Sequence, residues 1–386
     1  MYGKGGGKGG GKGGGKGGGG NPGKGEYYKN LYGGGGRGKG GGKGGGGGGN
    51  GGGQPMDVSD VASTPSKRLR SSSLEELRAT LLRIDNKPYP AYHDVEGIEF
   101  DMGRFHLVVQ HVQSDPFAPP SRCYVRVPLA NAAFPPSCFS PPIRSVALRD
   151  HLTRRFHAAA RKAGVDQRAG EGGWHGPKGG ELLVDLPGQH VLERSSVVVD
   201  SAEGFLEARF TVALPARGRS VLGEWAMTTL CVTLPELVHE ALFYAACDPA
   251  ALERHLLSVE DQQAARDQLA SKGLVAFVAD GSLLPRRTGA SDLPMDSKAA
   301  VPFTSPPALR VSLPVPNAGT LVGMGVPRGV TLIVGGGFHG KSTLLEALQV
   351  RVPREPPGCV TARALVAQAC VCVCVCVCVC VAGRFQ

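Results

Sequence analysis

The chain has 386 residues, 59 glycines and a formal net charge of +10, and glycine and charge are both concentrated at the N-terminus. Residues 1–54 hold 33 of the glycines, nine Lys or Arg and a single acid, Glu26, whereas the remaining 332 residues are about neutral. Glycine does not recur every third residue, which excludes collagen, and the length excludes a disulfide-rich mini-protein. The neutral part is long enough for one large domain or two smaller ones.

The eleven cysteines form neither a metal-binding nor a disulfide pattern. Five alternate with valine from Cys372 to Cys380, Cys359 and Cys370 precede that run, and four are widely spaced over 123–247. Because no CxxC pair occurs, we expect a reducing compartment, which is typical of cytoplasm or nucleus, and an organelle stays open. No secretory signal opens the chain.

Residues 1–72 are predicted to be disordered. Glycine and lysine dominate 1–54, and 55–72 are rich in Ser, Asp and Pro, so too little apolar surface is available to offset the chain entropy. The lysines and four tyrosines of 1–54 suit RNA through phosphate contacts and base stacking. A flexible solubilising tail also fits this composition, and a short nuclear signal at 67–70 is a further alternative.

Regular structure is predicted to begin at Ser73, which opens the capping box Ser-Leu-Glu-Glu ahead of leucines at helical spacing. The apolar pattern then predicts α+β structure that passes into α/β structure. The predicted strands are 105–112, 124–127, 182–185, 196–199, 208–214, 274–278 and 331–334, and the predicted helices are 146–163, 234–246, 249–272 and 342–349.

One motif carries chemistry, at residues 335–343, which read GGGFHGKST. It satisfies G-x-x-x-x-G-K-[ST] and lies between an apolar strand pattern and a leucine-spaced helix, which is the context that a phosphate-binding loop requires. Glycines let the backbone N–H groups turn toward phosphate oxygens, and the helix N-terminus adds partial positive charge. The motif therefore predicts ATP binding.

Each residue type in the motif has a predicted role. Lys341 is expected to reach the β- and γ-phosphates of ATP, and the Ser342 hydroxyl to ligate Mg²⁺. His339 is interpreted as a variable loop position, with approach to the γ-phosphate as the alternative, and no catalytic residue is assigned. The predicted nucleotide-binding set is Gly335, Gly336, Gly337, Phe338, His339, Gly340, Lys341, Ser342 and Thr343.

A second glycine-rich stretch, GGWHGPKGG at 172–180, is a weaker candidate. Pro177 removes a backbone N–H and no Ser or Thr follows Lys178, so a flexible hairpin tip is the favoured interpretation. The basic pairs at 217/219 and 286/287 lie beside turns. They are interpreted as solvated charges, with phosphate contact as the alternative.

Several stretches together resemble one family, the predicted ATPases of the ABC class, which are distinct from ABC transporters. They are HVQSDPFAPPSR (111–122), GQHVLERSS (188–196), ARFTVALPARGRSVLG (208–223), GLVAFVADGSLLPRRTGASD (273–292) and GTLVGMGVPRGVTLIVGGGFHGKSTLLEAL (319–348). The last is the most specific, because this family carries an aromatic residue where the usual ABC loop has a glycine. Over about 74–349 the resemblance implies an N-terminal α+β domain at 73–300 and the start of an ATP-hydrolysing P-loop α/β core at 301–349. It also implies self-association of the full-length protein.

The resemblance stops after Gln349, where the family would continue through an acidic Walker B strand and the ABC signature loop. A Val-Cys repeat is what a GT-repeat tract encodes, so residues 350–386 are interpreted as translated intron. A membrane anchor at 364–382 and another genuine tail are the less favoured alternatives. Membrane association is therefore not expected.

Without a Walker B carboxylate, this chain is expected to bind nucleotide and to hydrolyse ATP poorly or not at all. Strand 331–334 is also expected to lack its parallel neighbours. The alternative function is an RNA-binding protein that uses the Gly/Lys-rich tail, with nucleotide as a switch, and a pseudo-ATPase scaffold is a third.

Overall fold

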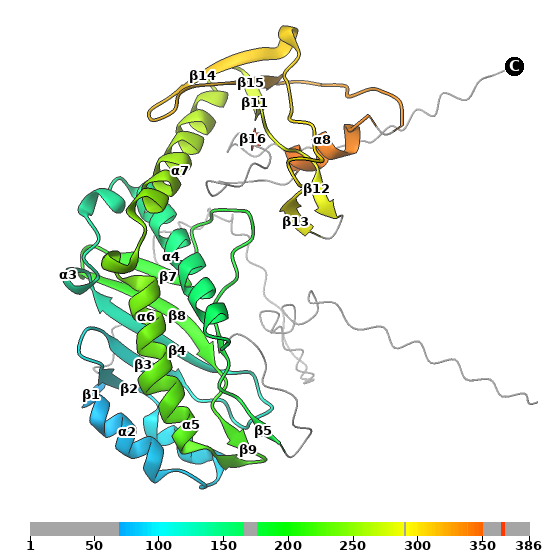
Figure 1. Cartoon of the computed structure of the whole chain (residues 1–386). Coiled ribbons are helices and arrows are strands. Elements are labelled where there is room, and N and C mark those ends of the chain that lie inside the picture. The colour runs from blue at the N-terminus through cyan, green and yellow to red at the C-terminus, as the bar shows by residue number, and fades with distance from the viewer. Residues whose placement is uncertain (1–68, 166–175, 289–290, 338, 350–363, 367–386) are drawn as a thin grey trace, which may run out of the picture. The chain divides into compact units, whose positions relative to one another are not determined.

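The computed structural model describes residues 69–165, 176–288, 291–337, 339–349 and 364–366 (Figure 1). Residues 1–68 of the segment 1–72 that was predicted to be disordered, and nearly all of the Val-Cys tail, lie outside these ranges. The prediction is wrong for residues 70–72, because Arg70–Ser73 form a strand that pairs with Ile98–Asp101. Within them, no helix combines the length and the apolar character needed to cross a membrane.

The described chain contains both helices and strands, with runs of several consecutive strands. Up to residue 242 these are β1 (Arg70–Ser73), α2 (Leu74–Arg83), β2 (Ile98–Asp101), β3 (His106–His111), β4 (Ser121–Pro128), α3 (Leu129–Ala132), α4 (Pro142–Lys162), β5 (Pro177–Lys178), β6 (Leu182–Leu183), β7 (Val197–Asp200), β8 (Phe205–Val212), β9 (Ala216–Arg217), β10 (Ser220–Val221), α5 (Gly223–Thr228) and α6 (Leu234–Leu242). They continue with α7 (Pro249–Leu269), β11 (Leu274–Ala279), β12 (Arg286–Thr288), β13 (Ser291–Pro294), β14 (Arg310–Val315), β15 (Gly319–Pro327), α8 (Lys341–Gln349) and β16 (Ala364–Val366).

The predicted capping box at Ser73 is confirmed. The Ser73 hydroxyl accepts a hydrogen bond from the Glu76 amide at 3.2 Å, and the Glu76 carboxylate accepts one from the Ser73 amide at 3.3 Å. Two of the N–H groups that a helix start leaves without intrahelical partners are thereby satisfied. Leu77 and Leu81 then turn into the core on one face of α2.

The larger sheet has the order β1-β2-β3-β4-β8-β6, and β7 also pairs with β8. Apart from the parallel β1–β2 pair, its ladders are antiparallel. Strand β4 shows the period of two that one buried face imposes: Cys123, Val125 and Val127 are buried, and Arg122, Tyr124 and Arg126 alternate with them. This is the face on which the core of the first domain forms.

Helices α4 and α6 cover the buried face of this sheet (Figure 1). Leu148, Leu152 and Phe156 of α4 are fully buried, and the Phe156 ring meets Phe210 of β8 edge to face at 5.7 Å. Aromatic pairs prefer this geometry because the ring edge is electropositive and the face electronegative. The apolar stripe of α4 therefore fixes the helix on the sheet.

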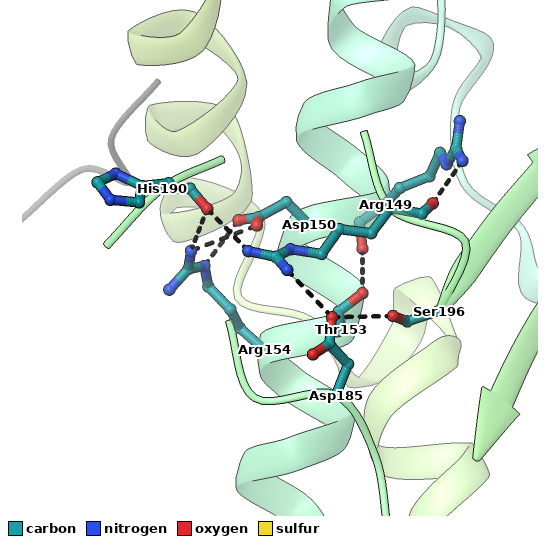
Figure 2. A network of polar contacts seen from close by, with 8 residues as sticks. Arg149, Asp150, Thr153, Arg154, Asp185, His190 and Ser196 are labelled. Atoms are coloured by element: carbon teal, nitrogen blue, oxygen red, sulfur yellow. Dashed lines mark hydrogen bonds and ion pairs between the residues drawn. The ribbon is translucent and has the colours of Figure 1, made fainter. Parts of the chain in front are cut away.

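A network of charged side chains lies along α4 (Figure 2). Asp150, which is fully buried, pairs with Arg154 one turn later at 2.6 Å. Arg149 donates to the carbonyls of Val197 and Arg194, so it holds the irregular segment before β7 against the helix. Because burying a charge is costly unless it is paired, we infer that these contacts are structural.

The smaller sheet has the order β14-β15-β11-β16, and its ladders are antiparallel. Gly323 of β15 is required where this strand pairs with β11, because a Cβ there would lie 2.2 Å from the Val278 carbonyl oxygen. Ala265 and Leu269 of α7 pack on one face of this sheet with Phe277 and Leu313. The predicted strand 274–278 and helix 249–272 are confirmed as β11 and α7.

Acid should destabilise the first domain because two buried histidines are neutral in the folded protein. The rings of His151 on α4 and His255 on α7 lie 5.3 Å apart, and His255 lies 3.5 Å from the Asp150 carboxylate. Burial lowers the pKa of His255 to about 3 and that of His151 to about 4, from an ordinary 6.5. The unfolded chain therefore takes up protons below pH 6.5 that the folded chain resists, so this stability is complete above pH 6.5 and is lost as the pH falls toward 4.

We expect the free energy of unfolding to fall below pH 6.5 with a slope approaching about 1.4 kcal/mol per pH unit for each histidine. His255→Gln should lower that slope by the contribution of one histidine. His239→Gln, at an exposed position on α6, is the control. Urea titrations followed by tryptophan fluorescence at pH 7.5 to 5 measure the slope. Equal slopes in all three proteins would contradict the assignment. Burial raises the pKa of Asp150, which offsets part of the loss only where that carboxyl takes up its own proton.

Candidate functional site

Helix α8 gives the phosphate loop its anchor. Ala347 is buried against Val278 of β11 and Met324 of β15, and Leu344 and Leu348 pack partly buried around them. The helix begins at Lys341, one residue before the predicted start, and the Leu344 amide donates to the Gly340 carbonyl at 2.9 Å. The N–H groups of the first turn have no intrahelical acceptor, so they are free to bind an anion.

Two glycines shape the loop that enters this helix. Gly335 has φ +153° and Gly340 has φ +76°, which are backbone conformations that L side chains rarely adopt. Gly340 stands in open space, so the backbone conformation and not crowding requires glycine there. The backbone conformation thus gives a reason for glycine at these two positions, and the contact of the loop amides with phosphate stays a prediction.

The cationic side chain of the motif is folded back on the loop. The Lys341 ammonium donates to the Gly336 carbonyl at 2.5 Å, and the Gly336 amide donates to Nδ1 of His339 at 3.2 Å. Sequence reasoning treated His339 as a variable loop position and missed this contact. No pattern in the sequence signals it, because the bond joins positions three apart within irregular backbone.

The residues present fit a nucleotide and its metal ion. Ser342 lies exposed in the first turn of α8, Thr343 follows it partly buried, and a lysine stands beside them. A hydroxyl next to an ammonium and free amides is the donor set that a magnesium triphosphate requires. Of the predicted set, Phe338 lies outside the described residues.

The predicted strand 331–334 is wrong. Residues 331–334 have no regular structure, and Leu332 and Val334 are 78% and 74% exposed. The ladder of β15 ends at Pro327, and none of the strands that the structure describes pairs with the segment beyond it. An apolar run of this kind forms a buried parallel strand only between neighbouring strands, so the pattern alone does not suffice.

The second glycine-rich stretch has a structural role where it is described. Strand β5 pairs with β9, so Lys178 lies opposite Ala216, and the hairpin tip predicted here is a strand of a small sheet. Gly179 and Gly180 follow with positive φ, and a Cβ on Gly180 would lie 2.7 Å from the Trp225 ring. The Lys178 ammonium lies 3.4 Å from the centre of the Phe117 ring. Residues 172–175 lie outside the described residues.

The structure separates the two basic pairs. Arg217 lies in β9 beside the second glycine stretch, whereas Arg286 lies in β12, which pairs only with β13 among the described strands. Their interpretation as solvated charges stays a prediction.

Two family models match the chain in succession. Residues 74–245 match the N-terminal domain of ATPases of the ABC class, and residues 248–366 match the P-loop domain of the ABC ATPases. The two matches meet just before α7. The boundary at residue 300 that the resemblance implied stays a prediction. No curated protein matches the chain.

The exposed segment before the loop yields a matched pair of variants. Leu332→Ala should change the free energy of unfolding by less than about 0.5 kcal/mol, because the Leu332 side chain is mostly exposed to water in the folded protein. Leu313→Ala, the same change at a fully buried position of β14, should cost about 2–5 kcal/mol through lost burial and the cavity left behind. Urea unfolding of the two variants measures the difference, and equal losses would show that residue 332 is packed in solution.

Proposed function

Because this chain belongs to the ABC-class ATPases, we propose that it binds ATP with Mg²⁺ at the phosphate loop 335–343. The observation that supports this most directly is a lysine at the start of a helix that is docked on the sheet through Ala347. The loop thus brings an ammonium, free helix amides and glycine-shaped backbone to one place. Together they are complementary to a triphosphate.

On binding, the Lys341 ammonium exchanges the Gly336 carbonyl for phosphate oxygens. The exchange is favourable because a charge-assisted hydrogen bond to phosphate is roughly twice as strong as one between neutral groups. The amides of the first turn of α8 bind the same phosphates. The Ser342 hydroxyl would hold Mg²⁺, which neutralises charge on the phosphate chain when bound.

We propose nucleotide binding, with hydrolysis poor or absent, as the activity of this chain. Hydrolysis needs a carboxylate that organises the metal and the attacking water beside the loop. Such a group ordinarily stands at the end of a strand adjacent to the one before the loop. No strand within the described ranges pairs with residues 331–334, so none of them brings an acid there.

RNA binding through residues 1–54 is the second candidate function, and its support is the charge of that segment. Nine basic residues stand against one acid, with four tyrosines among them. Such a composition attracts phosphates without sequence specificity and offers stacking to unpaired bases. Nucleotide would then act as a switch. Self-association of the full-length protein belongs to the first proposal, nucleotide binding, because the family resemblance implies it.

Lys341→Ala should weaken ATP binding about 100-fold, because it removes a charged donor that no other side chain of the loop replaces. Lys272→Ala, at an exposed position after α7, has the same chemistry away from the loop and should bind as wild type does. Isothermal titration with Mg²⁺-ATP measures both. Unchanged affinity in Lys341→Ala, or no binding by the wild type, would refute nucleotide binding at this loop.

Deleting residues 1–54 should weaken binding to a single-stranded RNA oligomer and flatten its salt dependence. The logarithm of affinity falls with the logarithm of salt by about 0.7 for each phosphate neutralised on a single strand, so loss of nine basic residues lowers the slope by several units. Fluorescence anisotropy at 50–200 mM salt gives the slopes. Lys341→Ala is the control and should bind RNA normally. A slope unaffected by the deletion would place RNA binding elsewhere.

A further inference from the structure

We propose that His339 is a positioning residue that ties the two arms of the phosphate loop together through the Gly336 amide. The proposal rests on ATP binding at this loop and concerns how the loop keeps its shape. The first arm, 335–337, and the second arm, 339–341, approach each other where the Gly336 amide donates to Nδ1 of His339 at 3.2 Å. The imidazole must then be neutral with its proton on Nε2, since a doubly protonated ring has no acceptor.

The geometry around Gly336 supports a specific contact. A Cβ on Gly336 would lie 3.2 Å from Cε1 of His339, and one on Gly335 would lie 3.6 Å from Nδ1. The imidazole thus lies against the backbone of the first arm, which approaches closely because these residues have no side chain. Glycine at 336 permits this approach as well as the curl of the loop.

Two side chains hold Gly336, and they differ in what nucleotide does to them. Lys341 bonds the Gly336 carbonyl and would leave it for phosphate, since the ammonium is the group that the anion attracts. His339 accepts from the amide and carries no charge in this state, so phosphate does not draw the ring away, although phosphate oxygens compete for the same amide. The histidine bond is therefore the tie that holds the two arms together before nucleotide binds.

This tie matters more because the segment before the loop has no ladder. Residues 331–334 are exposed and unpaired to other described strands, so the first arm is not held by a sheet. A loop that must be ordered on binding loses affinity to the entropy of ordering. The His339 bond reduces that cost by holding the arms together before nucleotide arrives.

The test compares His339→Ala with His339→Asn in the full chain. Asparagine keeps an acceptor oxygen at a similar distance from the backbone, whereas alanine has none. We expect Mg²⁺-ATP affinity, by isothermal titration, to fall about tenfold in His339→Ala and to stay within about twofold of wild type in His339→Asn. Rescue by asparagine separates the hydrogen bond from general packing of the ring.

A second measurement needs no nucleotide. Amide hydrogen exchange of the peptide that covers 335–341 should become faster in His339→Ala and stay near wild type in His339→Asn, because the Gly336 amide loses and then regains its acceptor. Unchanged exchange in His339→Ala overturns the positioning role whether or not ATP binds. Tighter ATP binding by His339→Ala also overturns it, since the ring would then obstruct the phosphates.

The proposed function and this inference fail in different ways. If the wild type binds ATP, Lys341→Ala does not, and His339→Ala binds as the wild type does, only the role of His339 is refuted. If the wild type does not bind ATP, nucleotide binding fails and the positioning role for nucleotide fails with it. The exchange measurement then still shows whether the Gly336 bond exists.

Discussion

A phosphate loop depends on the attachment of the helix that follows it, and here that attachment is a small apolar contact. Ala347 lies buried against Val278 and Met324, which places the first turn of α8 at one face of the smaller sheet. The contact requires strands β11 and β15 to lie close together, which Gly323 permits by leaving no Cβ against the Val278 carbonyl. The chemistry proposed for Lys341 and Ser342 therefore depends on residues that lie outside the loop.

Helix α7 links this sheet to the first domain. Leu252, Leu256 and Val259 belong to the core beneath the larger sheet, whereas Ala265 and Leu269 belong to the core of the smaller one. Between these two sets, the Asp261 carboxylate accepts the amides of Asn317 and Ala318, both at 2.9 Å, at the turn between β14 and β15. Its neighbour Glu260 bonds Arg144 of α4 at 2.9 Å and Asn317 at 3.2 Å. The hairpin whose second strand leads toward the phosphate loop is thus tied to both helices.

Local patterns predicted the elements whose causes are local. The capping box at Ser73, the alternation along β4 and the glycine and lysine spacing of 335–343 all reflect bonds or faces within a few residues. Strands β14 and β15 were missed. Glycines at 323 and 325 lower the strand propensity of β15, and only the neighbouring paired strands explain why glycine is needed there. The contact of His339 with Gly336 was missed for the same kind of reason, since no periodicity records it.

The one wrong strand shows what a sequence pattern leaves undetermined. Residues 331–334 have the apolar composition of a buried parallel strand. That composition shows only that the segment would be stabilised if other strands buried it, not that such strands are present. No described strand pairs with this segment, which lies exposed. The first arm of the loop is therefore held by the side chains of His339 and Lys341 and not by hydrogen bonds to a described strand. In the proposed complex Lys341 turns from Gly336 to the nucleotide, whereas the neutral imidazole of His339 holds the first arm before nucleotide arrives. A loop preceded by a paired strand would depend far less on that residue, so the importance proposed for His339 follows from the lack of pairing between 331–334 and the described strands.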